Sequence, residues 1–146
     1  MIDKINYNGI ELALIIRKSF EKDGIEFFTP DDYSQQIGYM RRPTGHMIPP
    51  HVHNPVARKV HFTREVLIIR SGKLRVDLYS DDAVYVESAI LEAGDIILLA
   101  SGGHGFEVLE ETEIIEVKQG PYAGDEDKTR FEGVDASEVV FKSAVT

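Results

Sequence analysis

Short apolar runs separated by turn residues follow one another along most of the chain. Within the runs, apolar and polar positions alternate with a period of two, most clearly over residues 74–79, as expected for strands with one buried face. We expect about ten strands, at residues 4–7, 10–17, 25–29, 35–42, 60–70, 74–79, 84–91, 96–100, 104–109 and 113–119. Their spacing, and the lack of a helical period after residue 24, predict an all-β antiparallel sandwich or barrel with little helix.

Turn residues set the connections between these strands. Asn8-Gly9 predicts a type I′ hairpin, because both central residues of that turn need a positive φ. Residues 10–17 also fit a short helix ending near Gly24, but we prefer a strand for the first part of this run. Residues 71–73 and 110–112 predict two further tight turns, and the prolines within residues 43–50 predict an extended segment.

The length of 146 residues fits one domain with a real core. We expect an N-terminal hairpin and entry strand over residues 1–35 and a barrel core over residues 36–122. Residues 123–146 are weakly patterned, and a tail, an edge strand and a dimer contact all remain open for them.

Charge and composition narrow the classes of partner. The formal net charge of −9 argues against nucleic acid or an anionic membrane as the main partner, because both need a basic patch. The chain has no cysteine, so any metal must be held by histidine and carboxylate. No apolar segment approaches the roughly 20 residues of a membrane span, and no signal peptide is recognisable at the N-terminus. We therefore expect a cytoplasmic protein.

Histidines and one glutamate form the most informative chemical pattern. His51 and His53 share a face if they lie on a strand, because side chains alternate, and neutral imidazole is a common transition-metal ligand. Glu65 opens an apolar run and should face inward with Leu67 and Ile69. An unpaired carboxylate there would be costly, and a bound metal would remove that cost.

His104 follows a Gly-Gly pair after another apolar run, and with it the pattern resembles the two motifs of the cupin superfamily. In the first motif, five residues separate a glycine from His-X-His, and six residues separate a glutamate from a second glycine. This matches Gly45, His51, His53, Glu65 and Gly72. The gap between His53 and Glu65 is eleven residues instead of three or four, an insertion that a hairpin loop accommodates at small cost.

The second cupin motif runs from a glycine through Pro-X-Gly to a histidine and an asparagine. Here Gly94 is followed by Ala100 in place of the proline, His104 arrives one residue early, and Val108 replaces the asparagine. The resemblance implies a double-stranded jelly-roll barrel and is greatest to small single-domain cupins with no settled activity. Fold alone does not define a reaction.

The resemblance also implies a mononuclear site for one divalent transition metal (Zn, Fe, Mn or Ni), with His51, His53, Glu65 and His104 as ligands. Such a metal would act on a small polar molecule as a Lewis acid or an oxygen-activating centre, so a dioxygenase, isomerase or epimerase activity stays open. One alternative is a metal-free, sugar-isomerase-like or ligand-binding barrel that uses histidine as a general base. A non-catalytic structural or regulatory barrel is another, in which His51 and His53 are surface residues of a loop.

Further residues are candidates for the substrate pocket or for contacts to the metal ligands. His61 lies four residues before Glu65. It could be an extra metal ligand or a partner of Glu65, but we prefer a position at the rim of the barrel. If these residues lie on a strand, alternation of side chains points either Arg41 or Arg42 inward, where it would suit a ligand with a carboxylate or phosphate group. The alternative is that both arginines are solvated charges at the edge of the sheet. The other candidates are Gln36, Tyr39, Lys118 and Tyr122. We also expect a homodimer, because an exposed edge strand is a liability that pairing between subunits hides.

Overall fold

The computed structural model describes residues 1–142, and these belong to two compact units. The first, here called the sheet unit, contains residues 1–20 and the chain from residue 63 onward, and the second, the hairpin unit, contains residues 21–62. The described residues contain only two short 3-10 helices, η1 (Gly124–Asp127) and η2 (Ala136–Glu138). Neither has the length or apolar character of a transmembrane helix. The predicted all-β class is confirmed at this level.

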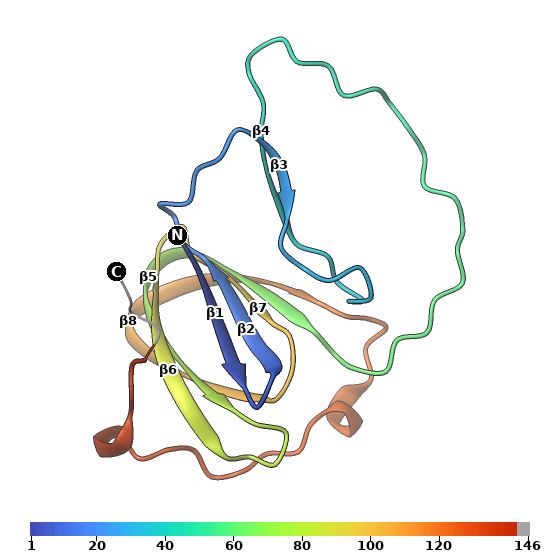
Figure 1. The fold of residues 1–146 in the computed structure, drawn as a ribbon. Helices are drawn as coiled ribbons and strands as arrows, with labels where there is room; N and C mark the ends of the chain where they lie inside the picture. Colours follow the sequence, from blue (N-terminus) through green and yellow to red (C-terminus); the bar gives the residue numbers. More distant parts are fainter. Residues whose placement is uncertain (143–146) are drawn as a thin grey trace. The chain divides into compact units, whose positions relative to one another are not determined.

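The sheet unit is built on one curled antiparallel sheet, a half-barrel. Its strands are β1 (Ile2–Tyr7), β2 (Ile10–Ile16), β5 (Glu65–Tyr79), β6 (Tyr85–Glu92), β7 (Ile96–Leu99) and β8 (Gly103–Lys118). The strand order is β1-β2-β7-β5-β6, and β8 pairs with β5 along its whole length. Figure 1 shows β5 and β8 as two long strands that curl side by side.

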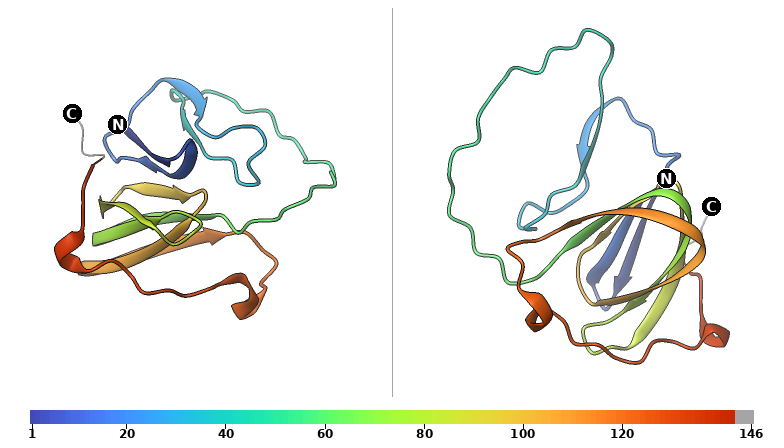
Figure 2. Two further views of the ribbon diagram at one scale, coloured as in Figure 1. Left: turned by 60° about the horizontal axis from the view of Figure 1, so that its bottom comes forward. Right: turned by 180° about the vertical axis from the view of Figure 1, so that it is seen from behind.

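The curl brings the two ends of β5 together. At its start, Glu65 pairs with Leu99 of β7 on one side and with Lys118 of β8 on the other. At its end, Tyr79 pairs with Gly103 of β8, and only three residues separate Gly103 from Leu99 along the chain. The ribbon of β5 and β8 therefore bends back on itself, as the right view of Figure 2 shows.

A bulge in the middle of the ribbon permits this curl. The β5–β8 register shifts between Ile69 and Leu74, where Gly72 has a φ of +87°. A Cβ at Gly72 would collide with the carbonyl oxygen of Glu111 on β8. The turns predicted at residues 71–73 and 110–112 are therefore wrong: both strands continue through these positions, and the turn-forming residues serve a bulge that increases strand twist.

The N-terminal hairpin has the predicted turn. Asn8 and Gly9 have φ values of 51° and 77°, and β1 pairs with β2 around them, so the alternative of a helix after Gly9 is excluded. Arg17 follows β2 and fixes the hairpin, since its guanidinium lies 2.7 Å from Asp3 and 3.1 Å from Asp95.

The buried core lies against one side of the curled sheet. Its cluster of apolar side chains comes from β1, β2, β5, β6 and β7, and none comes from β8. By contrast, β8 has large apolar side chains that remain at least 40% exposed. They are Phe106, Val108, Leu109, Ile114, Ile115 and Val117.

The hairpin unit contains β3 (Gly24–Phe27) and β4 (Gly38–Arg41), which pair antiparallel with each other. These are the strands expected over residues 25–29 and 35–42, each shorter than predicted. After Arg41 no strand occurs until Glu65, so the part of the predicted strand 60–70 before Glu65 is wrong, as is the placement of His51 and His53 on a strand. Four prolines between residues 43 and 55 remove backbone donors that a ladder needs.

Replacement of Gly72 by alanine should lower the free energy of unfolding by about 3 kcal/mol or more, because a left-handed residue gains strain and its Cβ meets the backbone of β8. Gly124→Ala is the control: Gly124 has a φ of +67° but open space around it, so the expected loss is only about 1 kcal/mol. Urea unfolding measures both, and equal losses would refute the role given to the bulge.

Candidate functional site

The closed ends of the β5–β8 ribbon place Glu65 and His104 in contact. Glu65 begins β5 and His104 is the second residue of β8, and the His104 Nε2 lies 3.3 Å from the Glu65 Oε2. Glu65 is only 7% exposed, and Leu67 and Ile69 are buried with it, which confirms the inward orientation predicted from alternation. Two residues from distant parts of the sequence thus form one polar site.

Lys118 compensates the buried charge of Glu65 from the other side. Its Nζ lies 3.5 Å from Oε1, while His104 contacts Oε2. The hydrogen bond from His104 is the largest influence on the pKa of Glu65 and lowers it; burial opposes this, and the charges of His104 and Lys118 lower it further. The argument that Glu65 needs a metal to offset its burial is therefore wrong, because protein groups already do so.

Asp127 extends this cluster and was not singled out by the sequence analysis. Its Oδ1 accepts a hydrogen bond of 2.5 Å from the Thr63 hydroxyl, and its Oδ2 lies 3.9 Å from the Lys118 Nζ. Asp127 ends the helix η1, within an acidic stretch that has no distinguishing pattern in the sequence. Charges of alternating sign thus run from Asp127 through Lys118 to Glu65.

A pocket of about 550 Å³ opens beside Glu65 and His104. Its aromatic wall includes Phe106, whose ring centroid lies 5.4 Å from that of His104. Segment 127–133 supplies another wall, with the cationic residues Lys128 and Arg130. The full lining is Thr63, Glu65, Tyr79, Gly102, Gly103, His104, Gly105, Phe106, Asp127, Lys128, Thr129, Arg130, Phe131 and Gly133.

Tyr79 fastens the wall formed by segment 127–133. Its ring meets that of Phe131 edge to face at 4.9 Å, and its hydroxyl accepts a hydrogen bond of 2.9 Å from the Val134 amide. The same strand end that closes the ribbon therefore also holds the pocket wall.

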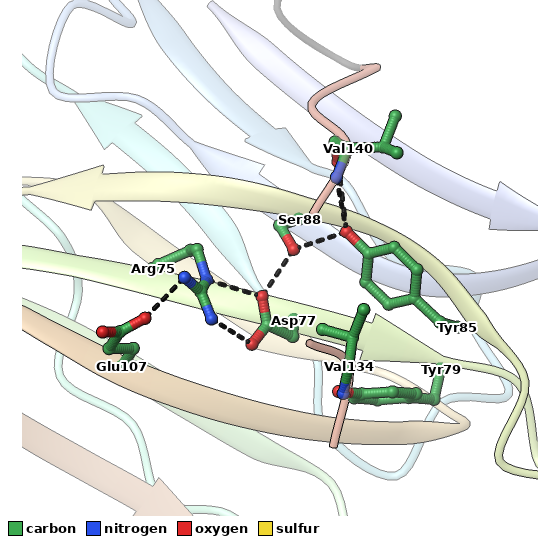
Figure 3. A network of polar contacts seen from close by, with 8 residues as sticks. All are labelled: Arg75, Asp77, Tyr79, Tyr85, Ser88, Glu107, Val134 and Val140. Atoms are coloured by element: carbon green, nitrogen blue, oxygen red, sulfur yellow. Dashed lines mark hydrogen bonds and ion pairs between the residues drawn. The ribbon is translucent and has the colours of Figure 1, made fainter. Parts of the chain in front are cut away.

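A second anchor holds the chain after the pocket wall, as Figure 3 shows. The Tyr85 hydroxyl accepts a 2.9 Å hydrogen bond from the Val140 amide and contacts the Ser88 hydroxyl at 2.7 Å. Ser88 donates to Asp77, which also receives two hydrogen bonds from Arg75. Residues 123–142 thus contain no strand, and they are held by side chains of the sheet together with a backbone hydrogen bond from the Ser88 amide to the Val140 carbonyl.

His51 and His53 form a pair within the hairpin unit. Their rings meet edge to face with centroids 5.2 Å apart, and both are exposed. The His51 Nδ1 lies 3.0 Å from the Pro49 carbonyl oxygen, which accepts its proton in the tautomer that leaves Nε2 with a free lone pair.

The other predicted pocket residues are spread over the two units. Gln36 accepts a hydrogen bond from the Thr29 hydroxyl and donates to two carbonyl groups, so it fastens the connection between β3 and β4. Arg41 lies 3.6 Å from Glu21 and is more than half exposed. Tyr122 is 92% exposed and, with Lys118, lines a smaller pocket of about 180 Å³ in the sheet unit. Arg42 and His61 are exposed, and Tyr39 is partly buried.

Taken within each unit, the four proposed metal ligands are found as two pairs, Glu65 with His104 and His51 with His53. Over residues 1–142, no three histidine or carboxylate side chains gather closely enough to hold one ion. Comparison with known proteins found no matching family model, curated protein or solved structure.

The lowered pKa of Glu65 predicts a specific loss of stability in acid. A depressed carboxyl pKa stabilises the fold fully above the ordinary value of 4.5, and this contribution disappears as the pH falls through the folded pKa. Glu65→Gln should therefore cost about 2 kcal/mol near neutral pH and progressively less in acid, in unfolding measured from pH 7 to pH 3. Glu116→Gln, at an exposed position of β8, is the control, and a pH-independent difference for Glu65→Gln would contradict the assignment.

The two tyrosine anchors should act on different amides. Tyr79→Phe should raise the hydrogen-exchange rate of the Val134 amide about fivefold, because it removes an acceptor contributing about 1 kcal/mol. Tyr85→Phe should do the same for Val140 and leave Val134 unchanged. Exchange followed by NMR on both variants makes each the control for the other, and equal effects on both amides would refute separate anchors.

Proposed function

We propose that the chain is a jelly-roll-type barrel protein that binds a small anionic molecule at Glu65 and His104. In this proposal, one divalent transition metal is held by Glu65, His104, His51 and His53. The observation that carries it is the 3.3 Å contact between Glu65 and His104, which the fold assembles from the ends of two strands.

The spacing of Glu65 and His104 suits a shared metal ion. Nitrogen and oxygen ligands lie about 2.0–2.2 Å from zinc, so two neighbouring ligands in a tetrahedral or octahedral shell are about 3.0–3.5 Å apart. The observed 3.3 Å falls in that range. Lys118 contacts the other oxygen of Glu65, so it can keep its place while Oε2 turns to an ion.

His51 has the surroundings typical of a metal-ligating histidine. Such residues usually donate the N–H of the second ring nitrogen to a carbonyl or carboxylate, which fixes the tautomer and the ring orientation. The Pro49 carbonyl is such an acceptor for Nδ1, and it leaves Nε2 for the ion. His53, two residues on with its ring against that of His51, supplies the second donor of this pair.

The pocket favours a small molecule with a negative charge and an apolar part. Its volume of about 550 Å³ lies within the range of small-molecule sites. Lys128 and Arg130 line it and have no ion-pair partner in the part of the chain that is described, whereas its two carboxylates, Glu65 and Asp127, already face Lys118. When bound, the metal would supply a Lewis acid beside this pocket. Phe106 and Phe131 provide apolar contact surface.

A metal-free site is the second candidate, and the contact between Lys118 and Glu65 favours it. In that arrangement, Glu65 accepts the Nε2–H of His104 and orients the ring. The ring then exchanges a proton with a ligand in the pocket through its other nitrogen. His51 and His53 have no role in this version.

Metal titration separates the two candidates. Calorimetry with Zn²⁺, Mn²⁺ or Ni²⁺ should show one site per chain, and His51→Ala with His53→Ala should weaken it by more than about 100-fold, beyond the loss of an outer-shell partner. His46→Ala, at an exposed histidine to which the proposal gives no role, is the control and should leave the affinity unchanged.

The possible outcomes are distinct. No stoichiometric metal in the wild type would refute the metal site and leave the metal-free candidate, which predicts binding of anionic ligands in the presence of EDTA. Equal affinity in the His51 and His53 variant would show that these two residues are not ligands.

A further inference from the structure

Strand β8 has an uncovered edge and an uncovered apolar surface. In the part of the chain that the structure describes, β8 pairs only with β5, so its other backbone edge lacks a strand partner. Its six large apolar side chains, which are distributed over both faces of the strand, are 40–59% exposed, and none belongs to the core cluster. A long apolar edge strand is a strong template for pairing with another chain.

The same strand is acidic. It carries Glu107, Glu110, Glu111, Glu113 and Glu116, against one basic residue, Lys118. Arg75 pairs with Glu107, and Arg70 lies 3.7 Å from Glu113. Glu110, Glu111 and Glu116 have no ion-pair partner within residues 1–142. Two β8 strands placed edge to edge would therefore bring like charges together, which destabilises such a pair.

One stretch of the chain has complementary character. Residues 39–62, here called the basic segment, contain Arg41, Arg42, Arg58 and Lys59 and no aspartate or glutamate, although the whole chain has a net charge of −9. No strand occurs in it after Arg41. Its exposed large apolar side chains are Met40, Met47, Ile48, Val52, Val56, Val60 and Phe62.

The last part of the basic segment can form a strand. Residues 56–62 follow the last proline of the segment, so every one of them has a backbone N–H to donate. In an extended conformation Val56, Arg58, Val60 and Phe62 share one face, and Lys59 and His61 lie on the other. Each face of such a strand carries a basic residue and one face is apolar, which complements the apolar and acidic side chains that β8 exposes on its two faces.

We propose that β8 of one chain binds residues 56–62 of a second copy, and that the exchange is reciprocal. Backbone hydrogen bonds to the free edge of β8 provide the affinity, as in strand addition to a sheet edge. Arg58 and Lys59 facing the unpaired glutamates of β8 provide the specificity. Because each copy has both a free β8 edge and a segment 56–62, a two-fold symmetric dimer pairs both edges with both segments.

A charge-reversal experiment tests this proposal. Variant A carries Glu111→Lys and Glu116→Lys, and variant B carries Arg58→Glu and Lys59→Glu. Light scattering in EDTA should give the wild type twice the 16.4 kDa chain mass, and each variant alone the single mass. An equimolar mixture of A and B should return to the double mass, since each strand then meets an oppositely charged segment. Asp31→Lys with Asp32→Lys, an equal charge change elsewhere, should remain dimeric.

Disulfide trapping gives a second measurement that reverses no charge and uses the absence of native cysteine. Arg58→Cys and Glu111→Cys, made in separate chains and mixed under mild oxidation, should form a mixed disulfide dimer in at least tenfold excess over Lys4→Cys mixed with Glu111→Cys. A monomeric wild type, a mixture of A and B that stays monomeric, or a dimer that neither variant dissociates would overturn the proposal. If residues 56–62 bind β8 of their own chain instead, the wild type is monomeric, and this result also overturns the proposal. Because EDTA is present throughout, none of these outcomes depends on the proposed metal site.

Discussion

The curl of the β5–β8 ribbon is the constraint on which the rest of the sheet unit depends. Flat strands of 15 and 16 residues would hold their ends far apart, whereas here Glu65 at one end of β5 and Tyr79 at the other both lie beside the short connection from β7 to β8. Gly72 lets β8 approach closely at the bulge, and Gly102 lets the connection approach the Tyr79 carbonyl. A Cβ at either position would press on backbone, so both glycines serve the same closure.

Closure decides the electrostatics of the site. Glu65 is buried by the strands around it, and the same closure places His104 at one carboxylate oxygen and Lys118 at the other. Desolvation of the acid is thus offset by two partners from opposite ends of β8. Each carboxylate oxygen thus has its own protein partner, and Glu65 also lines the pocket, an arrangement that fits a ligating carboxylate and an orienting one equally well.

Much of the fold could be predicted from alternation and turn chemistry. Asn8-Gly9 gave the correct hairpin, and the buried face of Glu65, Leu67 and Ile69 followed from a period of two. The bulge could not be predicted, because Ser-Gly-Lys has the same local preferences in a turn and in a bulge, and only the pairing with β8 distinguishes them. The contribution of Asp127 to the site could not be predicted either, because the chain after β8 brings it there without a regular pattern.

The pairing of Glu65 with His104 was anticipated only through the resemblance to known motifs, since local pattern says nothing of contacts between residues 39 positions apart. The contribution of Lys118 to Glu65 was missed for the same reason, although Lys118 was a candidate for the pocket. The jelly-roll topology and the joint action of all four ligands remain predictions.

One wall of the larger pocket comes from a segment outside the main cluster of buried apolar side chains. Residues 128–133 contain no strand, and none of them belongs to the buried cluster, while Tyr79 of the sheet holds them in place. Substitutions at the exposed Lys128 and Arg130 can change the size and charge of the pocket with little effect on folding stability. Under the proposed function, selectivity for a ligand and maintenance of the curled sheet would be carried by separate parts of the sequence, which gives natural variation or directed evolution a short region in which to alter recognition.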